Sequence, residues 1–242
     1  MALRIDILTL FPEMFGPVLG TSIPKRAAEK GLVSYHLTNI RDFATDAHKS
    51  VDDRPFGGGP GMVMLCQTMF DAVETVERQD PRPATRILLS PQGRLLNQEL
   101  VQELSRKDRL LLIAGHYEGF DERIIEGLSP MEVSIGDYVL SGGELAAMVV
   151  IDAVVRLLPG AIGHEQGAED ESFADGLLEF AQYTRPREFR GMAVPEILLS
   201  GNHAAIAKWR LEQRKARTQR RRPDLWQAWL ARRAADDKDK NE

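Results

Sequence analysis

Short apolar segments that end in glycine-containing turns recur in the first two-thirds of this chain. Arg86–Ser90 runs into Pro91-Gln92-Gly93, and Arg109–Ala114 runs into Gly115. Between them, Asn97–Ser105 has the pattern of a helix. Strand–helix–strand units build parallel sheets, because parallel neighbours need a long crossover connection. The pattern therefore predicts an α/β domain on a mainly parallel sheet.

The segment Gly143–Leu158 predicts a helix that carries apolar residues on nearly every side. A helix of this kind must be covered over most of its surface. One thin α/β domain does not easily supply that cover, so we expect this helix to form the interface of a homodimer. Further strands are expected at Leu3–Leu10 and Met131–Ile135.

Composition limits the class of protein. The chain has 242 residues, of which 43% are hydrophobic and 28% charged, as in ordinary globular proteins. Charged residues interrupt its longest apolar run, and Asp6 interrupts the N-terminal one, so we expect neither a membrane span nor an export signal. The single Cys66 excludes an internal disulfide and suits the cytoplasm. The histidines lack ligand spacing, so no metal site is expected.

The C-terminal third predicts a small helical domain with a basic surface. Ala204–Arg217 is strongly helical, with Asn202 as its N-cap, and Pro223-Asp224 begins a last short helix. The net charge of −5 hides eight basic residues and one acid between Lys208 and Arg222. Such a run is either a solvated face or a contact for phosphates. We expect an α/β domain at 1–161, a flexible linker at 162–174 and a helical domain at 175–242 with a disordered acidic tail.

The segment Asp52–Met62 is a candidate contact for a flat polar ligand such as a base. It contains four glycines in five positions, flanked by acids and an arginine. Glycines expose backbone N–H groups and allow close approach. The alternative is a mobile surface loop. If it binds substrate, the residues concerned are Asp52, Gly59, Pro60 and Gly61.

Three other loops follow predicted strands: Leu88–Gly93, Ala114–Gly119 and Ser134–Glu144. Ligands bind open α/β sheets at the carboxyl ends of strands. Each loop taken alone is an ordinary tight turn, and Glu144 an ordinary capping acid. Together they could form one pocket that offers backbone groups and an apolar slot, which suits an adenosine. His116 could serve as a base there, although a histidine after a strand is more often structural.

Seven segments resemble, in the same order, the bacterial tRNA (guanine-N1) methyltransferase family: DDRPFGGGPGM, LLSPQG, AGHYEGFDERI, SIGDYVLSGGELAAM, SFADGLLEF, YTRP and LLSGNHAAIAKWR. That family modifies the guanosine at position 37, just 3′ of the anticodon. The resemblance extends to about Trp229. It implies a deep trefoil knot of the SPOUT class, an obligate homodimer, a tRNA substrate and S-adenosylmethionine as methyl donor. It also allows Mg²⁺, with no ligand assigned, and implies no other protein partner.

The resemblance assigns residues to each ligand. The methyl donor would contact Leu89, Ser90, Pro91, Gly115, Tyr117, Glu118, Ser134, Ile135, Gly136, Asp137, Tyr138, Val139, Leu140, Gly142 and Gly143. Besides the glycine-rich loop, the tRNA would contact Arg185, Lys208, Arg220 and Arg221.

Methylation of guanine N1 requires a general base, because this nitrogen carries a proton, and a positive group near O6, where charge accumulates. Arg156 matches the family arginine that stabilises this charge; it could also pair with Asp152, and both roles are compatible. The family usually places an aspartate directly before Ser-Phe, where this chain has Glu171. Asp170 lies one residue earlier, so the base is Glu171, which we favour, or Asp170.

Two other functions compete with this one. A related knotted enzyme could methylate rRNA or another tRNA position. A non-catalytic RNA-binding protein could use the glycine loops to hold phosphate.

Overall fold

The computed structural model describes residues 2–162 and 171–239. The chain divides into two compact units, residues 1–163 and 164–242, which are described separately below. Most of the linker expected at 162–174 lies outside the described residues, and so does Asp170.

The first unit is built on a five-stranded sheet in the order β2-β1-β6-β5-β7. Every neighbouring pair in it is parallel, which confirms the predicted α/β class. The strands are β1 (Leu3–Thr9), β2 (Val33–Asn39), β5 (Thr85–Leu95), β6 (Arg109–Ile113) and β7 (Met131–Ser134).

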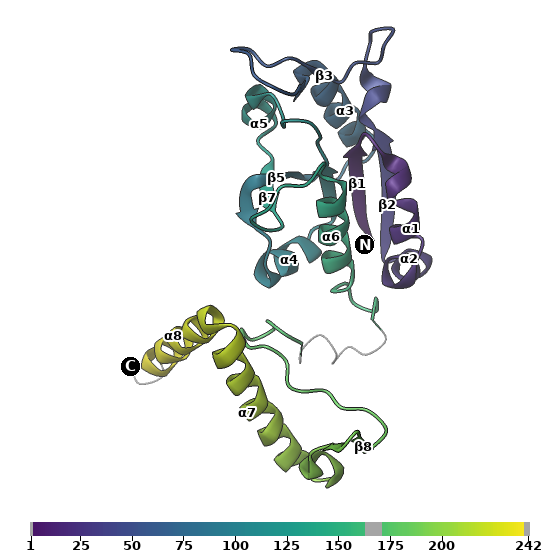
Figure 1. The fold of residues 1–242 in the computed structure, drawn as a ribbon. Helices are drawn as coiled ribbons and strands as arrows, with labels where there is room; N and C mark the ends of the chain where they lie inside the picture. Colours follow the sequence, from purple (N-terminus) through teal and green to yellow (C-terminus); the bar gives the residue numbers. More distant parts are fainter. Residues whose placement is uncertain (1, 163–170, 240–242) are drawn as a thin grey trace. The chain divides into compact units, whose positions relative to one another are not determined.

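Helices cover both faces of this sheet and enclose two hydrophobic cores (Figure 1). One core includes α1 (Gly16–Leu19), α2 (Ser22–Glu29), α4 (Gln98–Ser105) and α6 (Glu144–Val155). The other includes α3 (Cys66–Arg78) and α5 (Glu122–Leu128). Successive residues of a strand point to opposite faces, so Ile7 and Leu112 enter the first core while Leu8 and Leu111 enter the second. The remaining short elements of this unit are η1 (Pro12–Met14), η2 (Ile40–Phe43), β3 (Asp52–Asp53) and β4 (Val63–Met64).

Strand β5 is longer than expected. The sequence predicted that it ends at Ser90, but it continues to Leu95 after an irregularity in which Leu89 and Arg94 both pair with Val133. The residues between them bulge out of the ladder. Pro91 has no N–H to donate, which favours a bulge. The expected turn is therefore present, as an excursion within the strand.

Buried charged residues stabilise the sheet near the amino-terminal ends of β1 and β6. Arg109, whose side chain is fully buried, donates from Nε to Asp6 Oδ2 at 2.8 Å, and Arg4 Nε donates to Asp6 Oδ1 at 2.9 Å. Arg109 also donates to the carbonyl of Val76 in the last turn of α3, at 2.6 Å, and to that of Asp80 beyond the end of this helix, at 2.7 Å. All seven residues of β1 are buried, although apolar and polar residues alternate along it. This network is what permits a charged pair inside the strand.

Helix α6 is covered mostly by its own unit. It packs against α2 and α4, and its buried residues include Ala147, Val150 and Ile151. Leu145 and Val149, on another side, remain 51% and 46% exposed.

The second unit packs an extended segment against two helices. Its elements are β8 (Glu188–Phe189), β9 (Met192–Ala193), η4 (Glu196–Leu199), α7 (His203–Arg221) and α8 (Pro223–Asp239). Asn202 caps α7 as predicted, accepting a hydrogen bond from the Ala205 N–H at 3.1 Å. The buried Thr218 hydroxyl accepts from the Leu178 N–H at 2.8 Å, which joins α7 to the segment before it.

Helix α8 corrects one expectation. It has 17 residues and extends to Asp239, rather than being short. Its first residue is proline, which suits the first turn of a helix. Among the helices of the described residues, none has the length and apolar character to cross a membrane.

The buried charge network predicts a large effect for Asp6→Asn, which leaves two guanidinium groups beside a neutral amide. We expect the free energy of unfolding to fall by about 3–5 kcal/mol in urea titrations followed by circular dichroism. The control is Glu29→Gln, which removes the exposed partner of Lys25 at 3.7 Å and should cost less than about 1 kcal/mol. Equal losses for the two variants would contradict the role given to Asp6.

Candidate active site

A cavity of about 270 Å³ lies in the first unit, where three loops follow parallel strands. The loops are the bulge after Leu89, the turn at Gly115–Phe120 and the connection from Ser134 to Gly143. Parallel strands end at the same edge of a sheet, so the fold brings these distant segments together.

The structure brings nearly all of the expected donor-binding residues to this cavity. Those lining it are Leu89, Ser90, Pro91, Gly115, Tyr117, Glu118, Ser134, Ile135, Gly136, Tyr138, Val139, Leu140, Gly142 and Gly143. Asp137 does not line it. Sequence reasoning did not assign Gln92, Phe120, Glu122 or Ile125, which also line it. Gln92 and Phe120 belong to the same turns, whereas only the fold could place helix α5 here.

Two of the loops meet through their backbones. The Gly143 N–H donates to the Gly115 carbonyl at 2.8 Å, and a short bridge joins His116 to Gly142. A Cβ on Gly143 would stand 2.8 Å from Ala114 Cα, and one on Gly115 would overlap the Phe120 ring. Gly143 is therefore required for the approach of the two loops, and Gly115 for the close packing of the Phe120 ring.

A buried carboxylate ties the same loops to β1. Glu144, the first residue of α6, is 1% exposed. Its Oε1 accepts from the Thr9 hydroxyl at 2.6 Å, and its Oε2 lies 2.7 Å from His116 Nε2. From the sequence, Glu144 was predicted only to be an acid that caps the helix. The contact gives His116 a structural partner, in line with the more common role of a histidine after a strand.

The glycine-rich loop begins and ends beside this cavity. β3 and β4 pair and close its base, with Asp52 opposite Met64. The Glu118 N–H donates to the Met62 carbonyl at 2.9 Å, and Gly61 lies directly against the Glu118 side chain. Burial raises the pKa of the Tyr117 hydroxyl, and the adjacent Asp52 raises it further. Of the expected substrate contacts here, Asp52 and Gly61 therefore adjoin the cavity wall, although Gly61 is exposed, as are Gly59 and Pro60.

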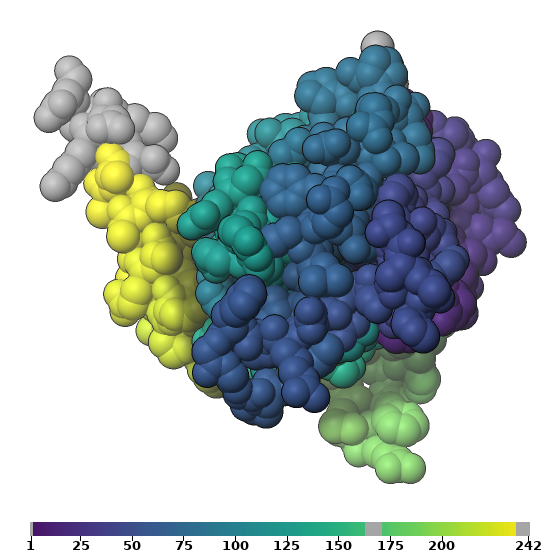
Figure 2. All heavy atoms as spheres, turned by 90° about the horizontal axis from the view of Figure 1, so that it is seen from above, coloured from purple at the N-terminus to yellow at the C-terminus, as the bar shows by residue number. Residues whose placement is uncertain are grey.

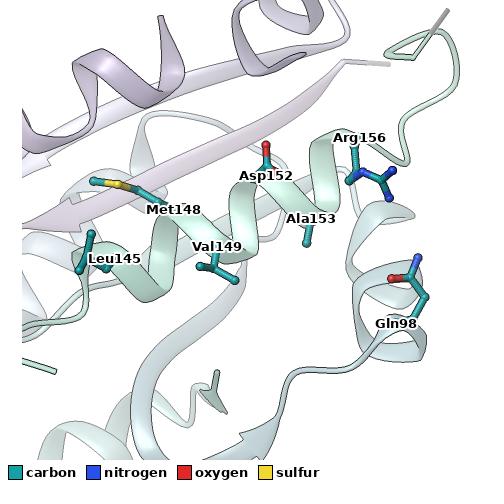
Figure 3. A pocket seen from close by; sticks show the side chains of 7 residues that line it. All are labelled: Gln98, Leu145, Met148, Val149, Asp152, Ala153 and Arg156. Atoms are coloured by element: carbon teal, nitrogen blue, oxygen red, sulfur yellow. The ribbon is translucent and has the colours of Figure 1, made fainter. Parts of the chain in front are cut away.

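Arg156 lies elsewhere on the first unit. It lines a groove of about 450 Å³ along α6, with Leu145, Met148, Val149, Asp152, Ala153 and Gln98. Figure 3 shows Arg156, directly after α6, and Gln98, at the start of α4, extending toward one another. Burial and the Asp152 carboxylate raise the pKa of Tyr35, on β2, to about 12. Within this unit Arg156 is thus next to the exposed apolar side of α6 and does not line the 270 Å³ cavity.

Glu171 lies at the start of the described part of the second unit. Its carbonyl accepts from the Ala174 N–H at 3.3 Å, in a compact turn. The Ser172 hydroxyl accepts from the Glu179 N–H at 3.0 Å, and the Phe173 N–H donates to the Leu177 carbonyl at 2.8 Å. These contacts fix the backbone that follows Glu171.

The chain matches the tRNA (Guanine-1)-methyltransferase TrmD family over residues 3–228. It belongs to this family. A tRNA (guanine-N(1)-)-methyltransferase of Moorella thermoacetica is 58% identical over 225 residues, covering 92% of this chain and 90% of the relative. Proteins of the same name from Dehalococcoides mccartyi, with 56% identity over 225 residues, and Geobacillus kaustophilus, with 57% over 223, cover 93% and 92% of this chain and 91% of each relative.

Membership implies the SPOUT class, whose fold contains a trefoil knot. Ordinary connection rules argue against knots, so sequence periodicity alone would not have suggested one. The family also implies a methyl donor for the reaction. Among the described residues, no three His, Cys, Asp or Glu side chains converge in a metal-binding arrangement.

The basic residues of α7, together with Arg222 directly after it, fall into two groups. Five have partners within the second unit: Arg210 lies over the Phe180 ring, Arg214 pairs with Asp175, Lys215 with Glu212, Arg217 with the Glu179 and Phe180 carbonyls, and Arg222 with Asp224. The others, Lys208, Arg220 and Arg221, are exposed and have no side-chain partner in the part of the chain that the structure describes; the same holds for Arg185.

Proposed function

We propose that this protein transfers a methyl group from S-adenosylmethionine to N1 of the guanosine at position 37 of tRNA. The observation that carries the proposal is the cavity in which three glycine-containing loops converge in a member of this family. The enzyme would act in the cytoplasm, where tRNA is modified.

The chemistry of the cavity fits S-adenosylmethionine. Leu89, Val133 and Ile135 provide apolar walls, and the turns around Gly115 and Gly142 bring backbone groups to its edge. An adenine ring needs an apolar slot and hydrogen bonds along its edge, which these features supply. When bound, the donor supplies a sulfonium-activated methyl group.

The protein must then manage a proton and a developing charge. As the bond between guanine N1 and the methyl carbon forms and the carbon–sulfur bond breaks, N1 loses its proton. We assign that proton to Glu171, with Asp170 as the alternative base. Arg156 stabilises the negative charge that builds on O6 as the proton leaves. A guanidinium suits this task, because it stays charged at any physiological pH.

The exposed side of α6 supports a homodimer. Leu145 and Val149 remain about half exposed on a helix whose other faces are buried, and they line the same groove as Arg156. Apolar patches of this kind mark interaction surfaces. A second copy of the chain seated on this groove would cover both residues and enclose Arg156.

The second unit supports tRNA binding. Lys208, Arg220 and Arg221 are exposed cations on one helix without partners in the described residues. Cations in this state can neutralise phosphates and release counterions without first breaking an internal ion pair. We assign residues 175–242 to tRNA recognition, with Arg185 as a further contact.

The function is tested by methyl transfer to unmodified tRNA transcripts that differ only at position 37. We expect transfer to a transcript with guanosine there and none to one with adenosine, with mass spectrometry placing the methyl group on guanine N1. A methyl group found at any other nucleotide would show that the enzyme modifies a different position. Absence of transfer to any RNA, together with calorimetry showing no S-adenosylmethionine binding, would contradict the proposal that this protein is a methyltransferase.

The assignment of the base predicts a selective loss of chemistry in Glu171→Gln. The amide cannot accept the proton, so the single-turnover rate should fall by about 100-fold or more. Binding of S-adenosylmethionine, measured by calorimetry, should stay near normal. The matched variant is Asp170→Asn. A collapsed rate for that variant, with a near-normal rate for Glu171→Gln, would transfer the role to Asp170.

The division of the cations predicts which of them bind tRNA. Replacing Lys208, Arg220 and Arg221 together with alanine should weaken tRNA binding. The slope of log affinity against log salt should become shallower by about 2, because each lost phosphate contact removes somewhat less than one unit. Lys215→Ala, in the same helix but paired with Glu212 at 3.0 Å, is the control and should leave the slope unchanged. A triple variant with the control's slope would remove these residues from the binding surface.

A further inference from the structure

Phe56 is 99% exposed, more than any other large hydrophobic residue in the described parts of the chain. Single exposed apolar residues are common, but a completely exposed aromatic ring on a loop is unusual, because so much apolar area stays in water. Folding of the first unit does not account for this residue. A role in binding would.

The loop that carries Phe56 is tied to the cavity. It spans residues 54–62, between β3 and β4, near the top of Figure 1. The Glu118 N–H donates to the Met62 carbonyl at 2.9 Å, and the Met64 N–H donates to the Gly119 carbonyl at 2.9 Å. The base of the loop is thus held beside the wall that contains Tyr117 and Glu118. Seen from above, blue segments from around residues 40–75 form much of the visible surface of the first unit (Figure 2).

The rest of the loop leaves the ring without neighbours. Gly57, Gly58 and Gly59 have φ values of +85°, +78° and +124°, and a Cβ on any of them would meet nothing within 4 Å. The nearest charged side chain in sequence is the exposed Arg54. A ring and a cation on an open glycine loop are suited to a base and its phosphate.

A protein partner fits these surroundings less well. Protein interfaces need a contiguous apolar patch with a buried centre. Here the residues that follow Phe56 are three glycines and a proline, so the ring stands alone. One flat ring covers one base, and every base offers a π face to it.

We propose that the Phe56 ring stacks on an unpaired base of the tRNA anticodon loop next to the guanine that is methylated. The inference rests on the proposed function. N1 lies on the Watson–Crick edge of guanine, and an enzyme that modifies a base takes it out of its stack. Its departure leaves a neighbouring base with an open face. The Phe56 ring covers that face and so favours the extruded state of the target.

The experiment compares Phe56→Ala, Phe56→Leu and Phe56→Tyr in the full-length protein with tRNA carrying 2-aminopurine at position 36 or 38. Stacking of an aromatic side chain quenches this fluorescent base. We expect quenching with the wild type and Phe56→Tyr at one of the two positions, and its loss with alanine and leucine. The last two should also lower tRNA affinity or the single-turnover rate about tenfold, a typical loss for one stacked base. S-adenosylmethionine affinity should not change.

Leu37→Ala, which removes a 40% exposed apolar side chain from β2, is the control and should behave as wild type. Full activity and quenching in Phe56→Leu would overturn the proposal, because leucine has no flat ring. A weaker dimer in sedimentation velocity for Phe56→Ala, with unchanged quenching, would instead place the ring against a second copy and also overturn it. If the wild type does not methylate guanosine 37, the proposed function fails, whereas the quenching comparison still decides whether Phe56 stacks on RNA.

Discussion

The contact between the Gly143 N–H and the Gly115 carbonyl, at 2.8 Å, positions the cavity wall and the start of α6 in the first unit. It joins the loop after β6 to the loop after β7, although β5 separates these strands in the sheet. The approach requires that Gly143 carry no side chain, because a Cβ there would stand 2.8 Å from Ala114 Cα. Because α6 begins immediately afterwards, the contact also places Glu144 where it reaches both Thr9 and His116. The cavity wall and the start of α6 therefore depend on one backbone crossing.

The charges of this protein divide according to whether folding uses them. Asp6 and Arg109 are buried and paired, and they hold the amino-terminal edge of the sheet opposite the cavity. Most basic residues of α7 also have partners in their own unit. The few exposed cations on α7, the apolar side of α6 and the Phe56 ring are features that folding leaves available. Each has a distinct chemistry, and we have assigned each to a different partner or contact.

The roles of residues near the site were predicted unevenly. The glycine turns were identified correctly as cavity walls because the carboxyl ends of parallel strands meet at one edge, whatever the loops contain. The Glu144–His116 contact was not predicted, since nothing in the spacing of two residues 28 positions apart indicates a hydrogen bond. Asp137 was expected at the cavity by its place in a motif, yet it does not line the cavity, because adjacent residues in a turn point in different directions.

The α/β class, the positions of most strands and helices, the Asn202 cap and, through the ordered motifs, the family could all be predicted from the residues of the chain alone. These follow from local periodicity, from capping chemistry and from residues that are near one another in the chain. Tertiary structure decided the strand order, the burial of Arg4 and Asp6 in β1, the bulge in β5 and the partners of the α7 cations. These depend on contacts between segments distant in sequence, where packing and hydrogen bonding override what each segment would favour alone.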